Sequence, residues 1–456
     1  MTDPNPDPTA GAALASSQLV RVLLVGALVL ALQVPILLID RQIGARRATR
    51  DEAVAEVTSR WGGEQRIAGP FLRVPWRERR VERSASGAAL ERVTVHHAIF
   101  LPDELHVRAN AKGESRRRGI FDVALYQADV ELAGTFHAPD FRDWDAAPDE
   151  ILWERAELLL AVADPHALRA QPTLAWGRAS VPFEPGGPAL TDCPPSLRAR
   201  LPQPHEAGTV AFHVALRLNG ATRIGFAPLG ESTSVALSSN WPHPSFEGRW
   251  LPAERTLAPN GFDARWEVSH LARGYPQRWR EGEVDAAALR RAELGVGFLA
   301  PVDPYRMAER SVKYEVLFLG LPFLAIWLFE VLASLRVHPI QYLFVGAALC
   351  LFYLLELALA EHLGFRAAYA LAATTCATMI TLYGRAILGA GRRAAVLGGL
   401  VAGLYAFLYA LLRDEDYALL LGTLGLFTAL ATAMWLTRNV DWYRLERRAT
   451  RPAEAS

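Results

Sequence analysis

Six long apolar runs set the pattern of the chain. One lies near the N-terminus, and five follow one another in the last third, separated by short charged segments. A membrane's hydrocarbon core is roughly 30 Å thick, and about 20 apolar helical residues are enough to cross it. Because soluble helices are rarely apolar on every face, the runs predict membrane-spanning helices rather than a soluble core. The predicted spans are residues 19–39, 316–335, 340–360, 367–386, 394–412 and 417–436.

The first run has the features of an uncleaved span rather than a signal peptide. It is longer than the usual apolar core of a signal peptide, and Asp40 and Arg41 follow it without a small-residue cleavage site. Pro35 predicts a kink near its outer end. Residues 1–18 are rich in Pro, Asp and Ala and predict a disordered cytoplasmic tail.

The arginines favour an orientation with both termini in the cytoplasm. Short loops facing the cytoplasm carry an excess of Lys and Arg. With the N-terminus inside, the inner loops and the tail 437–456 hold Arg336, Arg385, Arg392, Arg393, Arg438, Arg444, Arg447, Arg448 and Arg451. Arg41, Arg46, Arg47 and Arg50 oppose this orientation, but they head a long segment, where the rule weakens. Residues 45–310 are therefore predicted on the outer face, the periplasm of a two-membrane bacterium.

Alternation of apolar and polar residues dominates this outer segment. Examples are Val93 and Val95, then Leu105 and Val107, and Asn219-Gly220 predicts a hairpin turn. Strands bounded by Gly, Pro and Asn clusters predict antiparallel sheets in a sandwich-like arrangement. The predicted fold class is therefore a membrane α-helical bundle of six transmembrane helices plus a large β-rich, sandwich-like periplasmic domain.

Three further stretches carry local signals. Residues Arg50 to Trp61 predict an amphipathic helix just after the first span. The Pro-rich segment from Val181 to Pro204 predicts a long loop or a boundary between two β halves. FLPDEL (100–105) and FAPLGES (226–232) hint at a duplicated unit, although their similarity is too slight to establish one.

Composition and motifs give little sign of catalysis. The 456 residues carry a formal net charge of zero, so nothing points to a nucleic-acid partner. No phosphate-binding loop, GxSxG, HExxH or dinucleotide-binding glycine pattern is present, and no Cys/His pattern predicts a zinc site. His96 and His97 would point to opposite faces of a strand, so a shared metal is not expected. Of Cys193, Cys350 and Cys376, only Cys193 lies in the polar middle, which therefore cannot form its own disulfide. We expect a non-enzymatic protein without metal or cofactor.

The densest unusual stretch is Ser238 to Pro252, SSNWPHPSFEGRWLP. Pro242 and Pro244 fix the backbone and remove hydrogen-bond donors from a sheet. The stretch therefore predicts a rigid loop beyond a strand end. The candidate binding residues that it would display are Asn240, Trp241, His243, Phe246 and Trp250. A structural plug that covers one end of the sandwich, or rests on the membrane, is the simpler alternative.

Several polar residues fall within or beside the spans. An ionisable group at membrane depth costs at least a few kcal/mol unless it is paired or near water. Glu330 lies close to Arg336, so it is expected at the interface, and Glu356 is expected to pair with Arg366 or with outer water. A proton relay through Glu356, Glu361 and His362 is the alternative.

Several of these stretches resemble the CreD family of bacterial inner-membrane proteins. The resemblance rests on SNWPHPSFEGRWLPAER (Ser239 to Arg255), HPIQYLFVGAALCLFYLLELALAEHLGF (His338 to Phe365), LTRNVDWY (Leu436 to Tyr443), GPFLRVP (Gly69 to Pro75) and DYALLLGT (Asp416 to Thr423). It runs from the first span to Tyr443. It implies an inner-membrane protein under two-component control, associated with envelope integrity and tolerance to envelope-directed agents. It implies no catalytic residues.

The sequence therefore predicts a non-enzymatic protein that supports envelope integrity or an envelope-stress response through its periplasmic domain. The expected partners are the lipid bilayer and an unidentified envelope protein or ligand, and the oligomeric state stays open. The alternative is a small-solute or proton-coupled transporter or channel with the β domain as its receptor. The sparse polar lining of the spans speaks against this alternative.

Overall fold

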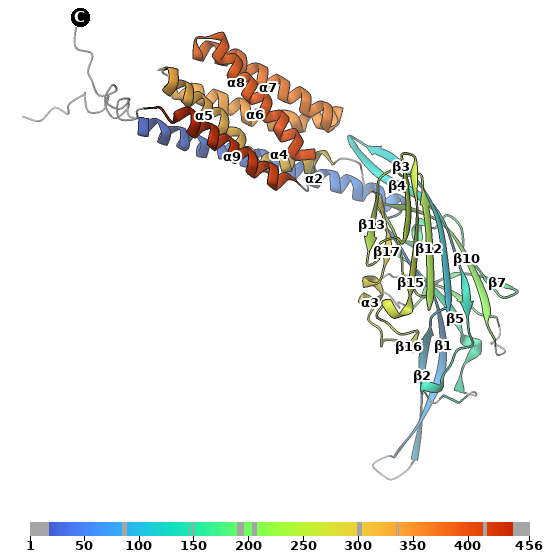
Figure 1. Cartoon of the computed structure of the whole chain (residues 1–456). Helices are drawn as coiled ribbons and strands as arrows, with labels where there is room; N and C mark the ends of the chain where they lie inside the picture. Colours follow the sequence, from blue (N-terminus) through green and yellow to red (C-terminus); the bar gives the residue numbers. More distant parts are fainter. Residues whose placement is uncertain are drawn as a thin grey trace, which may run out of the picture. The chain divides into compact units, whose positions relative to one another are not determined.

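The computed structural model describes residues 18–83, 89–144, 146–147, 150–188, 196–202, 208–298, 303–333, 335, 337–413 and 417–440. Within these ranges the chain forms two compact units, one of residues 18–51 with 303–440 and one of residues 52–298. Helices make up the first unit, and strands dominate the second (Figure 1). Cys193, residues 1–17 and residues 441–456 lie outside the described residues, so the predicted tails are described only at their inner ends.

Six helices of the described chain are long and apolar enough to cross a membrane. They are α2 (Gln18–Trp61), α5 (Glu315–Ala333), α6 (Pro339–Leu363), α7 (Phe365–Leu388), α8 (Gly391–Arg413) and α9 (Ala418–Thr437). They confirm the six predicted spans. The predicted separate helix at Arg50 to Trp61 is instead the end of α2. Residues 45–61 contain no Gly or Pro, so nothing interrupts the helix after the first span.

A short helix, α4 (Pro304–Lys313), precedes α5 and was not predicted. Asp303 caps it by accepting a hydrogen bond from the backbone N–H of Tyr305 at 3.0 Å, and Pro304 occupies the favourable first position. Its buried residues are Tyr305, Ala308, Ser311 and Val312, a spacing of three or four that defines one helical face. The sequence pattern did not reveal α4 because only ten residues carry this periodicity.

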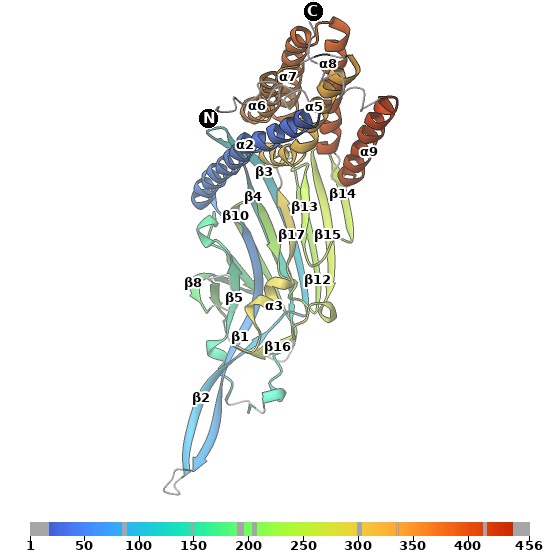
Figure 2. The ribbon, with the colours of Figure 1, turned by 90° about the vertical axis from the view of Figure 1, so that its left-hand side faces the viewer.

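The second unit is a β-sandwich, which confirms the predicted fold class (Figure 2). Within the described residues, the order of sheet A is β13 (Pro244–Gly248), β17 (Leu294–Phe298), β11 (Arg223–Phe226), β1 (Gln65–Arg83), β5 (Glu157–Val162), β9 (Ser196–Arg200) and β8 (Glu184–Gly187), with β2 (Ala89–Phe100) between β1 and β16 (Arg278–Arg280). The order of sheet B is β14 (Glu254–Ala258), β15 (Gly261–Ser269), β12 (Ser232–Ser239), β3 (Glu104–Arg118), β4 (Phe121–Phe136), β10 (Val210–Ala221), β6 (Thr173–Trp176) and β7 (Ala179–Pro182). Helix α3 (Ala286–Arg291) precedes β17.

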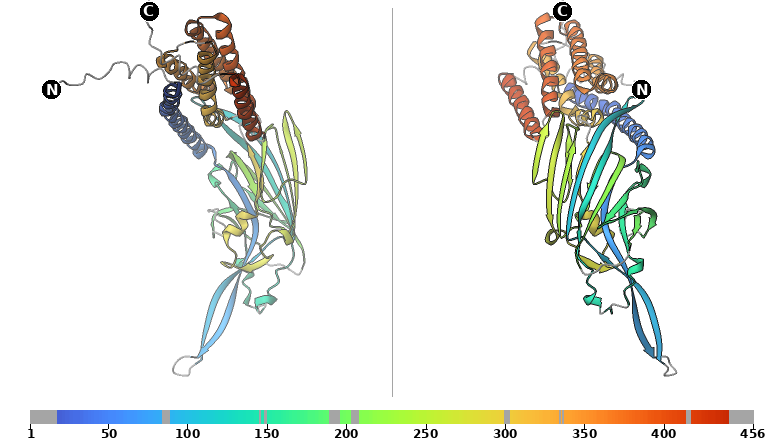
Figure 3. Two further views of the ribbon diagram at one scale, coloured as in Figure 1. Left: turned by 60° about the vertical axis from the view of Figure 1, so that its left-hand side comes forward. Right: turned by 90° about the vertical axis from the view of Figure 1, so that its right-hand side faces the viewer.

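One continuous apolar core fills the space between the sheets. Along β3, Leu105, Val107 and Ala109 are buried, whereas His106 and Arg108 on the other face are exposed. This is the alternation expected for a sheet with one face in the core and one in water. The far ends of β1 and β2 pair only with each other and extend beyond sheet A as a two-stranded arm (Figure 3).

The two similar stretches FLPDEL and FAPLGES occupy equivalent places. Each leads from a strand of sheet A into a strand of sheet B: β2 into β3, and β11 into β12. The connections lie side by side, with the N–H of Glu231 donating to the Pro102 carbonyl at 3.0 Å and that of Ser232 to the Asp103 carbonyl at 2.9 Å. Strands β3 and β12 then run parallel as neighbours, as do β1 and β11, so both sheets are mixed rather than antiparallel as predicted. The two stretches therefore have similar sequences because each links a strand of sheet A to a strand of sheet B.

A buried arginine holds both connections in place. Arg273 is 2 % exposed and donates to the carbonyls of Pro228, Leu229 and Gly230. It also donates to Gln277, whose side chain in turn donates to the Pro102 carbonyl at 2.6 Å. A buried cation is stable only when such acceptors surround it. No local pattern signals the role of Arg273, because the three backbone carbonyls that it binds lie more than 40 residues away in the chain.

The Pro-rich segment from Val181 to Pro204 was predicted as a long loop or as a boundary between two β halves, but part of it forms strands. It contributes the short strands β8 and β9 at one edge of sheet A. Pro185 is accommodated in β8 because an edge strand has one side without a partner strand.

Candidate functional site

Ion pairs join α2 to α4 and α6 within the first unit. Arg50 lies 2.7 Å from Asp303, the residue that caps α4, and both side chains are about three-quarters buried. Arg47 lies 3.5 Å from Glu309 on α4, and Arg46 lies 3.7 Å from Glu361 on α6. We call these pairs the α2–α4 clamp. They account for three of the four arginines that opposed the predicted orientation, because Arg46, Arg47 and Arg50 each have a carboxylate partner.

Glu361 is held from a second side. The hydroxyl of Tyr305 on α4 donates to Glu361 Oε1 at 3.0 Å. Burial, and next the hydrogen bond to Glu361, raises the pKa of Tyr305, which therefore stays protonated and remains a donor. The adjacent His362 is exposed. The described contacts thus assign Glu361 to the clamp and give His362 no part in it.

Glu356 lies deeper and has fewer contacts. It is 0 % exposed, and its Oε2 accepts a hydrogen bond from Ser311 on α4 at 3.0 Å. The predicted pairing with Arg366 or with outer water is not found in the described chain: Arg366 is exposed, and Glu356 forms no ion pair. Packing of α4 over α6 explains the difference, because α4 covers the carboxyl group and separates it from water and from Arg366.

Glu330 is placed near the end of α5. Its Oε1 accepts the backbone N–H of Val337 at 2.5 Å, and its Oε2 accepts the hydroxyl of Tyr342 at 3.3 Å. These donors satisfy a buried carboxylate by bridging α5 to the start of α6, which is a structural role. Arg336, the predicted neighbour of Glu330, lies outside the described residues.

The aromatic segment from Ser239 to Trp250 crosses from sheet B to sheet A. Asn240 extends the β3–β12 pairing: its amide donates to the Gly113 carbonyl at 3.1 Å and its oxygen accepts the Gly113 N–H at 2.7 Å. The Trp241 ring stands edge-on to Phe298 in the core. These contacts are those of a segment that closes one end of the sandwich.

The predicted rigid loop is correct only in part. Residues Pro244–Gly248 form β13, an edge strand of sheet A, with Pro244 in first place where a missing donor is tolerated. Phe246 packs edge-on against Phe262 and Trp266, and the Trp250 carbonyl accepts the Trp266 indole N–H at 3.1 Å. Of the five candidate residues, Asn240 and His243 are exposed, and the three aromatic residues are partly buried.

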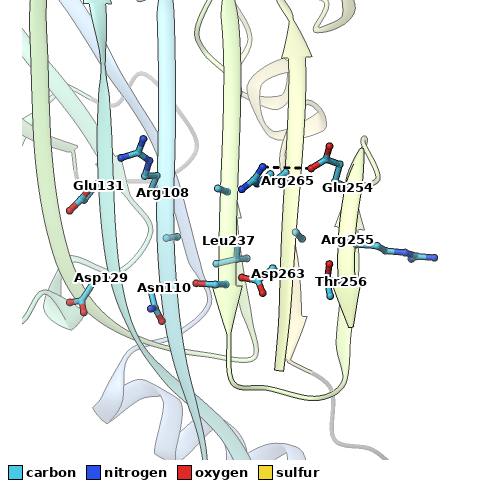
Figure 4. A pocket seen from close by; sticks show the side chains of 14 residues that line it. Arg108, Asn110, Asp129, Glu131, Leu237, Glu254, Arg255, Thr256, Asp263 and Arg265 are labelled. Carbon is cyan, nitrogen blue, oxygen red and sulfur yellow. Dashed lines mark ion pairs between the residues drawn. The ribbon is translucent and has the colours of Figure 1, made fainter. Parts of the chain in front are cut away.

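A polar depression lies on the outward face of sheet B, and we call it the sheet-B trough (Figure 4). Its volume is about 860 Å³. The strand register sets a row across five strands: Glu131, Arg108, Ala236, Arg265 and Glu254. The next row holds Asp129, Asn110, Ser238, Asp263 and Thr256. The alternation of side chains along each strand explains why these residues are on the outward face. Which residues lie side by side on neighbouring strands depends on the register of strand pairing.

The first row is arranged as acid, base, small residue, base, acid. Neighbouring strands lie about 4.8 Å apart, so the Cα atoms of Arg108 and Arg265 are roughly 10 Å apart across Ala236. Arg265 lies 3.7 Å from Glu254, with both side chains mostly exposed, and Arg108 forms no ion pair in the described chain. Two guanidinium groups above a small-residue floor suit an anionic group such as a carboxylate or phosphate.

The histidine pair faces two ways, as predicted for a strand. His96 lies 2.8 Å from Glu78 and against the Trp76 ring, whereas His97 lies 3.2 Å from Glu281. Glu281 also accepts from Arg73, which binds Glu157 at 2.7 Å. In the described residues, no group of three or more His, Cys, Asp or Glu side chains is arranged to hold a metal ion.

The fold defines a class of multi-pass membrane protein. The described part of its chain forms six apolar helices of membrane-spanning length, and a two-sheet β-sandwich is inserted in the sequence between the first and the second of them. A family model described as "Inner membrane protein CreD" matches residues 17–443. The inner membrane protein CreD of Escherichia coli (strain K12) is 32% identical over 417 residues, which is 91% of each chain. The chain therefore belongs to the CreD family of inner-membrane proteins, as the sequence resemblance indicated.

Proposed function

We propose that this protein is a non-enzymatic inner-membrane protein that supports cell-envelope integrity through contacts of its β-sandwich. In this proposal both termini lie in the cytoplasm, and the sandwich lies in the periplasm. Membership of an inner-membrane family supports the location, and the arginine distribution supports the orientation. The α2–α4 clamp supports a role in which the sandwich acts on the bundle, because α2 and α4 are the helices that adjoin it in the chain.

The sheet-B trough is the observation that carries the proposal. Its row of two arginines and two flanking glutamates favours a polar partner that presents an acidic group over Ala236. The aromatic segment from Ser239 to Trp250 is a weaker surface, since Trp241 and Phe246 are largely committed to core contacts. We therefore infer that an envelope protein or ligand with an exposed carboxylate or phosphate docks in the trough.

The test places a photo-crosslinking amino acid at Ala236 in the full-length protein, in intact cells. We expect one defined adduct, which is lost when Arg108 and Arg265 are both changed to Gln. The same double variant should fail to restore growth to a strain that lacks the protein, on a sublethal detergent concentration. The matched control is Arg169→Gln with Arg200→Gln, which removes the same charge from exposed positions outside the trough.

A second variant separates the two surfaces. Changing Trp241, His243 and Phe246 to alanine should leave the Ala236 adduct in place if the protein still folds. The proposal is wrong if the trough variant retains both the adduct and full complementation while it remains folded in the membrane. Loss of the adduct in the aromatic variant alone would instead make the segment from Asn240 to Phe246 the contact surface.

A further inference from the structure

Of the buried carboxyl groups in the described bundle, Glu356 has the fewest compensating contacts. It projects from α6 and is 0 % exposed, as is its partner Ser311 on α4. Its Oε2 accepts one hydrogen bond, from the uncharged Ser311 hydroxyl at 3.0 Å. Its Oε1 has no hydrogen-bond partner within the described chain. The neighbouring Glu361, five residues further on, has both an arginine and a tyrosine hydroxyl.

Among the described residues of the bundle, no cation faces Glu356 from the helices packed around it. Tyr353 of α6 lies within electrostatic reach of both Glu356 and Glu315 of α5. Tyr369 of α7 and Tyr405 of α8 lie within reach of Glu356 as well. Arg310, one residue before Ser311, directs its guanidinium to the carbonyls of Leu411 and Leu412 at 3.1 and 3.0 Å. The polar groups that the described helices place near Glu356 are therefore hydroxyl groups.

An ionised carboxylate in this setting would keep most of its desolvation penalty. One hydrogen bond from a neutral hydroxyl cannot replace water around a full negative charge. A proton on the carboxyl group removes the charge, and the Ser311 hydroxyl can then pair with the neutral acid. In the described bundle, no group of three or more His, Cys, Asp or Glu side chains could hold a metal cation here, which leaves the proton as the ligand that fits.

We propose that Glu356 is a proton-binding site inside the bundle and that its neutral form holds α4 against α6. When the proton is lost to water, the carboxylate requires hydration, and the Ser311–Glu356 contact opens to admit it. The one covalent change in this step is the transfer of the proton from the carboxyl oxygen to a water oxygen. Because α4 is the first helix after the β-sandwich in the chain, the proton controls how firmly that connection is anchored. The site is independent of the sheet-B trough.

The first test is infrared spectroscopy of the full-length protein in phospholipid nanodiscs. We expect a carbonyl band of a protonated carboxyl group at neutral pH, which shifts in D2O and is absent from Glu356→Gln. The matched control is Glu361→Gln, which changes a carboxyl group with an arginine partner and should leave that band in place. If wild type and Glu356→Gln have the same band intensity at neutral pH, Glu356 is ionised and the proton site is refuted.

The second test measures the release of α4. Ala308 is 1 % exposed on the buried face of α4, so a cysteine there reports opening. Two proteins are compared, both with Cys193→Ser and Ala308→Cys, and one also with Glu356→Gln. At high pH, a water-soluble maleimide should label the cysteine at position 308 several-fold faster in the protein that keeps Glu356. The ratio of the two rates cancels the pH dependence of the thiol itself. A ratio that stays constant with pH would overturn the coupling of the proton to α4.

Discussion

Single buried polar residues hold the sandwich together at places that apolar packing cannot fix. Arg273 and Gln277 bind the two connections between the sheets, and Tyr275 adds a hydrogen bond to the Pro228 carbonyl at 2.9 Å. Backbone carbonyls in such turns have no strand partner, so side-chain donors must satisfy them. Burial raises the pKa of Tyr275, which keeps its hydroxyl available as a donor.

His97 belongs to a charged network with Arg73, Glu157 and Glu281 on sheet A. Burial, and next the positive charge of Arg73, lowers the pKa of His97 below its usual 6.5, although Glu281 opposes this. The folded chain therefore binds a proton at His97 less readily than the unfolded chain does. Below pH 6.5 the unfolded state gains more protons, so the contribution of His97 to stability falls as the pH falls.

His97→Gln should remove this part of the pH dependence. We expect the unfolding midpoint of the wild-type protein to drop relative to that of His97→Gln between about pH 7 and 5. Tryptophan fluorescence during urea titration of the full-length protein in nanodiscs measures both midpoints. His243→Gln is the control, because His243 is exposed. A wild-type midpoint that rises relative to His97→Gln on acidification would contradict the assignment.

At the scale of elements, α4 connects to the bundle through side chains at both of its ends. Its first residues meet α2 and α6 through Asp303 and Tyr305, and its last turns meet α6 and α8 through Ser311 and Arg310. A ten-residue helix has little stability of its own, so these contacts determine whether it is helical and where it lies. Asp303 serves twice, as helix cap and as the partner of Arg50.

Two substitutions at Asp303 separate these tasks. Asp303→Asn keeps a good cap but loses the charge, and should cost up to about 1 kcal/mol for the partly buried ion pair. Asp303→Ala loses both and should cost roughly 2 kcal/mol in total, since a cap contributes about 1 kcal/mol. Unfolding in detergent mixtures with increasing SDS measures the difference. Arg50→Ala should add little to Asp303→Asn, and Arg41→Ala, on an exposed part of α2, is the control. Additive effects of Arg50→Ala and Asp303→Asn would show that the pair is not coupled.

At the scale of the whole molecule, two features concern the membrane: the exposed apolar surface of α9 and the direction in which the chain crosses the bilayer. Of the described residues of α9, Ala418 alone is buried, and Phe427 and every leucine except the partly buried Leu421 are exposed. In a bilayer such a helix contacts lipid or another protein. The orientation with both ends in the cytoplasm is our proposal from the arginine distribution, and reporters can determine it directly.

Fusions along the chain should therefore alternate in activity. Alkaline phosphatase, which matures only in the periplasm, should be active when fused after residue 298 or after Leu363, and inactive after Leu388. A green fluorescent protein fused after Ser456 should fluoresce, since the C-terminus is expected in the cytoplasm. Matched expression levels, checked by immunoblot, control for unstable fusions. Phosphatase activity after Leu388 with none after Leu363 would reverse the proposed topology.

The sequence by itself determined the features that depend on local pattern. Apolar runs of membrane length predicted six spans, because a bilayer demands about 20 apolar helical residues whatever surrounds them. Alternation predicted the strands, and motifs such as SNWPHPSF identified the family. Several element boundaries differ from the prediction: α2 continues to Trp61, and α4 was missed. Asn219-Gly220, predicted as a hairpin turn, instead lies within β10 and pairs with β4.

The tertiary structure decided which polar groups meet. Ser311 and Glu356 are 45 residues apart, and Arg50 and Asp303 are 253 apart. The row across the sheet-B trough joins five strands through a parallel β3–β12 pair that no hairpin signal could reveal. Likewise, Phe246 was expected on a loop and packs on the core. Periodicity fixes which face of an element is polar, but only the pairing of elements distant in sequence fixes which polar face lies opposite another.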